Sequence, residues 1–186
     1  MAANTIFYNA RLVSLISFLL GTGIFIFYYF TDATLVIFFG IGFIIIAGFT
    51  NLVYLILVIT QIKKAKEKRR SYFLTCSIIF LNFPIMILYC WFTLTLMNIM
   101  RITLVNKTAS IINDIKILGC EEKHIDKLEP NESKLVWVAI SGDCLINIEF
   151  NKNGKLEGEN ILGYITSNAG YRMTHRITEK NIRLNK

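Results

Sequence analysis

Charged residues are missing from three long stretches of this 186-residue chain. Residues 12–30, 34–60 and 72–100 contain no Asp, Glu, Lys or Arg, and most of their side chains are apolar. A helix of about 20 such residues crosses a hydrocarbon core about 30 Å thick. The absence of charge excludes an ordinary soluble domain for residues 1–100 and predicts three transmembrane helices.

Ionisable side chains are missing from the middle of these spans, where they usually mark transport or proton transfer. The spans are few, and they show no internal repeat of the kind that transporters carry. The sequence therefore argues against a channel or carrier. It favours helices that pack on one another or on partner helices.

The sequence also lacks the combinations of residues that catalysis needs, such as a nucleophile with a base, a metal cluster or a phosphate-binding loop. The segment CEEKH, residues 120–124, gathers titratable groups, and we interpret it as a solvated turn. His175 follows the alternation of Met173 and Ile177, so we interpret it as a sheet residue. We expect no enzymatic activity, no cofactor and no metal.

A few small and polar residues remain inside the spans. Ser17 and Gly21 form a small-xxx-small pair in the first span, Asn51 lies in the second, and Asn82 and Pro84 lie in the third. Small pairs let helices approach closely, and Asn hydrogen-bonds to neighbouring helices, so we interpret these residues as helix-packing residues. Proline removes one backbone hydrogen bond and predicts a kink. A small-molecule or ion site at this kink is the alternative.

Most of the positive charge lies in one loop, QIKKAKEKRR at residues 61–70. Basic loops between spans stay in the cytoplasm and contact anionic lipid. The loop has neither the folded basic face nor the stacking aromatics that nucleic-acid binding uses, so nucleic acid is not an expected partner. The residues that set the topology are Lys63, Lys64, Lys66, Lys68, Arg69 and Arg70.

This assignment predicts a protein integral to the cell's inner membrane, with a cytoplasmic N-terminus. Residues 101–186 then lie outside, which means the periplasm if the source is a bacterium. The first apolar run is longer than the core of a cleaved signal peptide, and no small-residue cleavage site follows it. We therefore expect the first span to remain in the mature protein.

From residue 101 onward, short alternating apolar segments replace the long runs. Turn-forming sequences such as EPNES, NKNGK and SNAG separate them. About seven short strands with a turn every 8 to 12 residues predict an all-β antiparallel sandwich. The expected strands are at residues 102–106, 111–119, 123–128, 134–140, 144–150, 161–166 and 170–178.

The segment IDKLEPNESKLVWVAI, residues 125–140, resembles a recurrent stretch of immunoglobulin-like sandwich modules. In those modules a Leu-x-Pro-x-Glu-Ser turn leads into a β-strand. The resemblance implies an immunoglobulin-like fold and implies no activity.

The expected strand at residues 134–140 is apolar on both faces. Either the domain itself covers both faces, or one face contacts a partner. We predict that Trp137, or Val136 and Val138 on the opposite face, contacts something beyond the sandwich. The candidates are the end of the third helix and a separate protein.

Four cysteines divide between the two regions. Cys76 and Cys90 lie in the third span and are interpreted as packing residues. Cys120 and Cys144 are expected at the same end of the sandwich, where an oxidising compartment allows a disulfide. Cys120 is out of phase with the strand before it, so the pairing requires a bulge at Gly119.

Two other interpretations of the outer domain stay open. Cys120, His124 and Cys144 are residue types that bind zinc or copper, although no fourth ligand is evident. Asn106 and Asn131 begin the sequons NKT and NES, which matter only in a eukaryotic secretory pathway.

Together these observations favour a non-catalytic integral membrane protein that presents a β-sandwich for contact with another membrane or periplasmic protein. In this interpretation it is an accessory or assembly subunit of an envelope complex. The alternative is an immunity protein against a membrane-acting or periplasmic toxin. The chain resembles, in size and number of spans, the small polytopic proteins that protect bacteria in this way.

Overall fold

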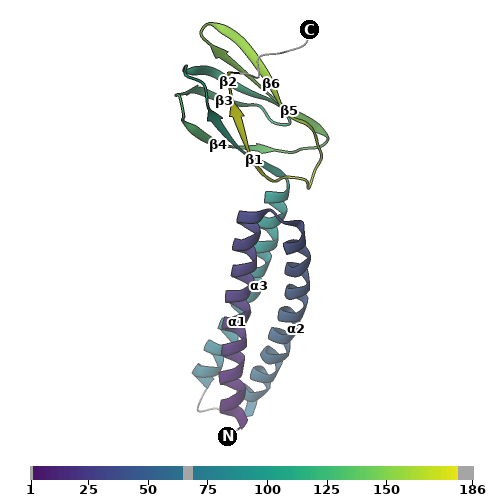
Figure 1. The fold of residues 1–186 in the computed structure, drawn as a ribbon. Helices are drawn as coiled ribbons and strands as arrows, with labels where there is room; N and C mark the ends of the chain where they lie inside the picture. The colour runs from purple at the N-terminus through teal and green to yellow at the C-terminus, as the bar shows by residue number, and fades with distance from the viewer. Residues whose placement is uncertain (1, 65–68, 180–186) are drawn as a thin grey trace. The chain divides into compact units, whose positions relative to one another are not determined.

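The structure is a computed structural model that describes residues 2–64 and 69–179 (Figure 1). The chain divides into two compact units, Met1–Thr93 and Leu94–Lys186. The first unit is helical, and the second unit holds all seven strands. The expected combination of three long apolar helices and a β-sandwich is confirmed.

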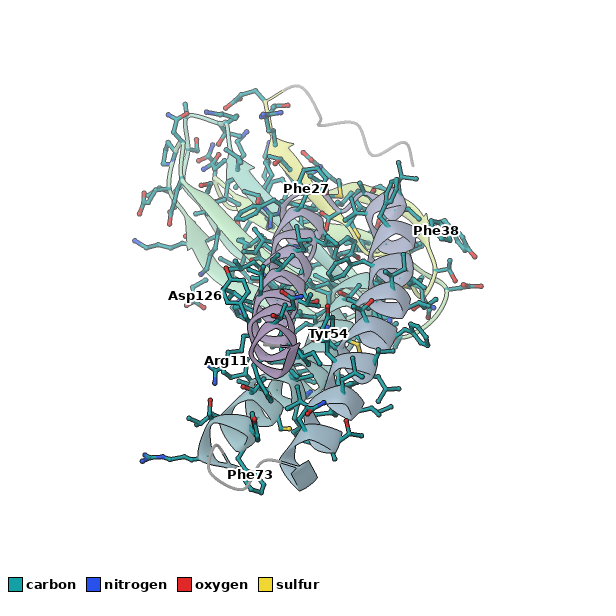
Figure 2. All side chains as sticks on the ribbon, turned by 90° about the horizontal axis from the view of Figure 1, so that it is seen from below. Arg11, Phe27, Phe38, Tyr54, Phe73 and Asp126 are labelled. Atoms are coloured by element: carbon teal, nitrogen blue, oxygen red, sulfur yellow. A yellow bond between two sulfur atoms is a disulfide. The ribbon has the colours of Figure 1, made fainter. Side chains whose placement is uncertain are left out.

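The first unit contains helices α1 (Ala2–Thr31) and α2 (Thr34–Lys64) and most of α3 (Arg69–Met97), whose last turn belongs to the second unit. Figure 1 shows the three helices side by side. Each is long and apolar enough to cross a membrane. Large apolar side chains cover the outside of the bundle: Phe38 and Phe73 are 67% and 52% exposed (Figure 2). This distribution suits a helix bundle whose surroundings are lipid.

The helix boundaries differ from the uncharged runs at three places. Helix α1 begins ten residues before the first run, and α2 and α3 extend into the basic loop, so Lys63, Lys64, Arg69 and Arg70 belong to helix ends. Lys66 and Lys68 lie outside the described residues. Polar residues at these ends continue a helix as readily as apolar ones, which is why hydropathy alone misplaced the ends.

The third run, residues 72–100, contains both a helix end and a strand start. Helix α3 ends at Met97 and strand β1 begins at Ile99. The side-chain amide of Asn98 donates to the Leu94 carbonyl at 3.0 Å, and the Gly170 N–H donates to the Met97 carbonyl at 2.7 Å. These bonds satisfy carbonyls that the end of a helix leaves open. Composition could not mark the boundary because Met100 in β1 is as apolar as the span.

The second unit contains two sheets. Strands β1 (Ile99–Asn106), β4 (Ser133–Ala139) and β7 (Arg172–Ile177) form a sheet in the order β4-β1-β7. The other sheet has the order β3-β2-β5-β6 and contains β2 (Ile112–Gly119), β3 (Lys123–Leu128), β5 (Cys144–Lys152) and β6 (Lys155–Ile165).

The strand order explains the immunoglobulin-like character of the sandwich. In immunoglobulin domains, strands B and E pair in one sheet, and C′, C, F and G form the other. Strands β1 and β4 take the places of B and E, and β3, β2, β5 and β6 take those of the second sheet. Strand β7 occupies the place of strand A beside β1, where it pairs in parallel, so the expected all-antiparallel arrangement fails at this one position.

Apolar side chains from both sheets meet in one core that is rich in isoleucine. Alternation along each strand directs every second residue inward, as for Ile146, Ile148 and Phe150 in β5, all with no exposed surface. Strand β6 begins at Lys155 rather than at residue 161. Its first half pairs with β5 through a tight turn with positive φ at Asn153 and Gly154, and its polar side chains give no apolar alternation to detect.

Candidate functional site: an open sheet edge and a polar helix network

Strand β4 lies at an edge of its sheet. It pairs with β1 from Ser133 to Ala139, and no described strand lies on its other side. The sequence analysis considered the two faces of this apolar strand, and the strand order adds that the strand is paired on one edge alone among the described strands. An edge strand presents a row of backbone groups that can pair with another chain.

The register of β1 and β4 decides which backbone groups face that edge. The Ile140 N–H donates to the Asn98 carbonyl at 2.9 Å, so this pair is a hydrogen-bonded one. In an antiparallel ladder such pairs alternate with residues whose N–H and C=O groups point to the opposite side. Leu135 and Trp137 are therefore residues of β4 that direct their backbone groups to the open edge.

The side chains of β4 divide between the core and the surface. Val138 is completely buried in the core, and Val136 packs against it, whereas Leu135 and Trp137 are 48% and 41% exposed. The face that contains the two valines is thus occupied within the sandwich. Contact with a partner stays a prediction for Trp137, whose neighbour on the same exposed face is Leu135.

Glu121 closes one end of the β4 edge. Its Oε2 accepts the Ala139 N–H at 2.7 Å, and its Oε1 accepts from the Lys123 ammonium at 2.6 Å. The bond from Lys123, followed by the bond from Ala139, holds the pKa of this carboxyl below its ordinary value of 4.5. The open part of the edge therefore lies toward Leu135 and Trp137.

The other three sheet edges differ from β4 because charged residues line them. Charges on edge strands discourage pairing with other chains. Strand β4 carries one charge, Lys134, near its start, and the rest of the strand is uncharged. The charged edge residues are Lys123, Asp126 and Lys127 on β3, Lys155, Glu157 and Glu159 on β6, and Arg172 and Arg176 on β7.

The predicted disulfide is present. Cys120 and Cys144 are bonded, with 5.2 Å between their Cα atoms. The phase problem is solved at Gly119, whose φ is +117°, a conformation that other residues rarely adopt. A Cβ atom there would lie 1.9 Å from the Leu145 carbonyl oxygen, so glycine is required. The irregular pairing of β2 and β5 lies elsewhere, between Asn113 and Lys116.

The bonded cysteines also decide the metal interpretation. A disulfide provides no thiolate, so Cys120 and Cys144 are not available with His124 as ligands. His124 instead contacts Asp114, with 2.9 Å between Nε2 and Oδ1. Residues 2–64 and 69–179 contain no group of three or more His, Cys, Asp or Glu side chains arranged to hold a metal ion.

The two sequons occupy different environments. Asn106 is completely buried, and its side chain donates to the carbonyls of Ser110 and Leu128 and accepts from the N–H and hydroxyl of Thr108. The NKT triplet is therefore a turn motif. Asn131 lies in an exposed turn with φ +63°, and its side chain accepts from Lys107.

His175 joins the edges of the two sheets. Its Nε2 lies 2.7 Å from Oε2 of Glu159, and both side chains are largely buried. The sequence placed His175 correctly among the sheet residues. It gave no sign of the partner, because Glu159 lies in the polar half of β6 that sequence patterns did not identify.

Four polar residues of the helical unit form one hydrogen-bonded network across three helices. The Asn82 amide donates to the Ser14 carbonyl at 3.0 Å, to the Ser14 hydroxyl at 2.8 Å and to the Asn51 side-chain oxygen at 3.4 Å. The Asn51 amide donates to the Ser17 hydroxyl at 2.9 Å. Gly21 continues the α1–α2 contact, since a Cβ there would lie 3.4 Å from the Phe43 ring.

This network uses the amides that a ligand at the Asn82–Pro84 segment would need. Asn51 and Ser14 are 3% and 1% exposed, so the network is enclosed by the helices. Pro84 lies inside α3, which runs without a break from Arg69 to Met97. The geometry favours helix packing over a small-molecule site.

Sequence reasoning missed Arg11 and Ser14 in this unit. Arg11 precedes the uncharged run 12–30, but it lies within α1 and bonds to α3: Nε donates to the Thr75 hydroxyl at 2.8 Å, and Nη2 donates to the Ser71 hydroxyl at 3.0 Å. The detectable signal was spacing. Arg11, Ser14 and Ser17 recur at every third position, which places them on one side of a helix.

No protein-family model matches the chain, and no curated protein matches it. Among solved structures, a protein from Eubacterium rectale determined by NMR is similar to 45% of this chain and 82% of its own length, with 14% sequence identity and a TM-score of 0.35. A similarity at this level carries no argument about the function or the fold.

Proposed function

We propose that this chain is a non-catalytic integral membrane protein whose sandwich binds an extended segment of another protein along strand β4. The observation that carries the proposal is the contrast between edges. Three edges carry several charges, whereas β4 is uncharged from Leu135 onward and has open backbone groups at Leu135 and Trp137.

Strand addition to a sheet edge explains how such a surface works. Backbone hydrogen bonds from Leu135 and Trp137 give affinity, and alternate side chains of the added strand give specificity. The added segment would place apolar side chains against Leu135 and Trp137, because these residues lie on one face. A half-exposed Trp is well suited as an anchor, since buried aromatic residues dominate many interfaces.

The proposed orientation is an N-terminus in the cytoplasm and a sandwich outside the inner membrane, motivated by the basic residues 61–70. A reporter that works only outside the cytoplasm should be active when fused after Lys186. An active reporter within the basic loop and a silent one after Lys186 would reverse the orientation.

The binding proposal is tested on the full-length protein in its native membrane. A photo-crosslinking residue at position 137 should capture one partner of constant mass, and the substitutions Leu135→Lys and Trp137→Lys should abolish co-purification of that partner in mild detergent. The matched control is Leu156→Lys, because Leu156 is also an exposed leucine on an edge strand, at 72% exposure on β6. Equal capture by the β4 and β6 variants contradicts the proposal.

The identity of the partner separates the two versions of this function. An accessory subunit co-purifies with other envelope proteins at a constant ratio. An immunity protein binds a toxin at the same edge, and its deletion kills the host when the toxin gene is present. We propose the accessory role first, because a stable partner alone explains the open edge strand, and a toxin is not needed.

A further inference from the structure

Arg11 bonds to α3 at the level where the apolar runs of α1 and α3 begin. Arg11 directly precedes the uncharged run 12–30, and Ser71 directly precedes the run 72–100. The hydrogen bond between Arg11 and Ser71 therefore aligns the starts of these two apolar runs at one level. Since each run is long enough to fill the hydrocarbon core, this level is that of the lipid headgroups.

The guanidinium of Arg11 is held in place by neutral acceptors. Nε donates to the Thr75 hydroxyl, and Nη2 donates to the Ser71 carbonyl at 3.2 Å and to its hydroxyl at 3.0 Å. Among the described residues none accepts from Nη1. The side chain is exposed on the outside of α1 (Figure 2), so Nη1 is accessible to an acceptor from the surroundings.

The surroundings of Arg11 have few acidic residues and an excess of positive charge, which favours binding of an anion. Residues 1–100 contain two acidic residues, Asp32 and Glu67. Asp32 follows the far end of α1, about 30 Å away along the helix axis at 1.5 Å per residue. Glu67 lies outside the described residues, in the segment 61–70 that also contains six basic residues. Arg70, in the first turn of α3, is exposed and adds positive charge next to Ser71.

We propose that Arg11, with Arg70 and the Ser71 hydroxyl, binds the phosphate of an anionic phospholipid such as phosphatidylglycerol. Arginine suits this ligand because its planar fork donates parallel hydrogen bonds to phosphate oxygens. Basic pockets between transmembrane helices bind anionic headgroups in this manner. The acyl chains would lie along the exposed apolar side chains beyond the headgroup level, such as Leu12 and Leu74.

Lipid binding to the full-length protein in mild detergent tests the site by native mass spectrometry. Phosphatidylglycerol should bind more tightly than phosphatidylcholine, and Arg11→Gln should weaken phosphatidylglycerol binding about tenfold, which corresponds to one charge-assisted hydrogen bond of about 1.4 kcal/mol. The charge-matched control is Lys63→Gln, which removes one positive charge from the basic segment and should change binding less than about twofold if attraction by that segment is diffuse.

Equal losses in Arg11→Gln and Lys63→Gln would overturn the proposal, because they would assign the attraction to net charge. Binding of inorganic phosphate in the absence of lipid would also overturn it, because the site would then bind the free anion. Arg70→Gln keeps the test decisive if Arg11→Gln does not fold. A loss in Arg70→Gln beyond that of Lys63→Gln supports the site, and no such loss overturns it.

Discussion

The two units of the chain differ in which residues they leave exposed. In the helical unit, Ser14, Asn51 and Thr75 are enclosed, and Phe38 and Phe49 are about two-thirds exposed. In the sandwich, isoleucine and phenylalanine fill the core and most charged residues face outward, with Arg101 and Lys152 as buried exceptions. The difference follows from the surroundings of each unit. In lipid, burying apolar side chains between helices gains no hydrophobic free energy, whereas in water it does.

This contrast identifies where each unit obtains its specificity. The helices are apolar almost everywhere, so apolar contacts distinguish poorly between alternative packings, and the network of Asn82, Ser14 and Asn51 selects one. The sandwich selects its register through alternation, because a shift by one residue would expose its whole core. Mutations should therefore have opposite consequences in the two units.

The largest expected effect comes from making the same substitution in both units. Phe150→Ala removes a fully buried ring from the sandwich core and should lower its free energy of unfolding by about 3–5 kcal/mol. Phe38→Ala removes a ring that is 67% exposed, so its effect should stay within about 0.5 kcal/mol. Hydrogen exchange of the full-length protein in bilayer nanodiscs measures both. Equal losses of unfolding free energy in the two variants would contradict this difference in exposure between the units.

The cysteines provide the second contrast. Replacing Cys120 and Cys144 with Ser should destabilise the sandwich by roughly 3 kcal/mol, because the crosslink closes a loop with a sequence separation of 24 residues. Replacing Cys76 and Cys90, which are not bonded to each other, should leave the sandwich unchanged. Peptide mapping without reduction should find only the first pair linked. Free thiols at both positions, in protein from an oxidising compartment, would exclude the disulfide.

Much of the fold could be predicted because each unit has a clear pattern of apolar residues in its sequence. Uncharged runs revealed the helices, and alternation revealed all seven strands, including the core positions of β5. Where alternation failed, prediction failed as well. The first half of β6 has Leu156 as its one large apolar residue and shows no apolar alternation, and Met100 continues the apolar run of the helix into β1.

The sites were less predictable, because they depend on which segments become neighbours. The apolar strand at residues 134–140 indicated an unusual surface, but only the strand order β4-β1-β7 shows that β4 is an edge, and only the packing shows that Val138 belongs to the core. Arg11 was overlooked for the same reason. Its partners, Ser71 and Thr75, are 60 and 64 residues away in the sequence.

The helical network gives a smaller effect that tests the specificity argument. Asn82→Leu removes an amide that joins three helices and should cost about 1 kcal/mol, since single polar contacts between membrane helices average about 0.6 kcal/mol and this residue makes more than one. Ser77→Ala on the exposed side of the same helix should have almost no effect. Steric-trapping measurements in bilayers determine both values. A stabilising Asn82→Leu would mean that the network does not select the packing.

The smallest effect concerns Glu121, which closes the end of the β4 edge. Bonds from Lys123 and Ala139 lower the pKa of its carboxyl from 4.5, so the unfolded chain binds more protons than the folded chain in the window below 4.5. The carboxylate therefore contributes stability that is complete above that window. The contribution is lost as the pH falls through the lowered pKa.

Glu121→Gln should accordingly reduce the stability of the sandwich at neutral pH and make no difference once the pH is well below 4.5. The effect stays small because the side chain is 38% exposed and water screens the ion pair. Glu122→Gln is the matched control, since the neighbouring carboxylate is exposed and no described residue bonds to it. Unfolding midpoints of the full-length protein across acidic pH decide the question. If both variants lose stability equally at neutral pH, then Glu121 does not secure the end of the edge strand, and the open part of β4 extends to Ala139.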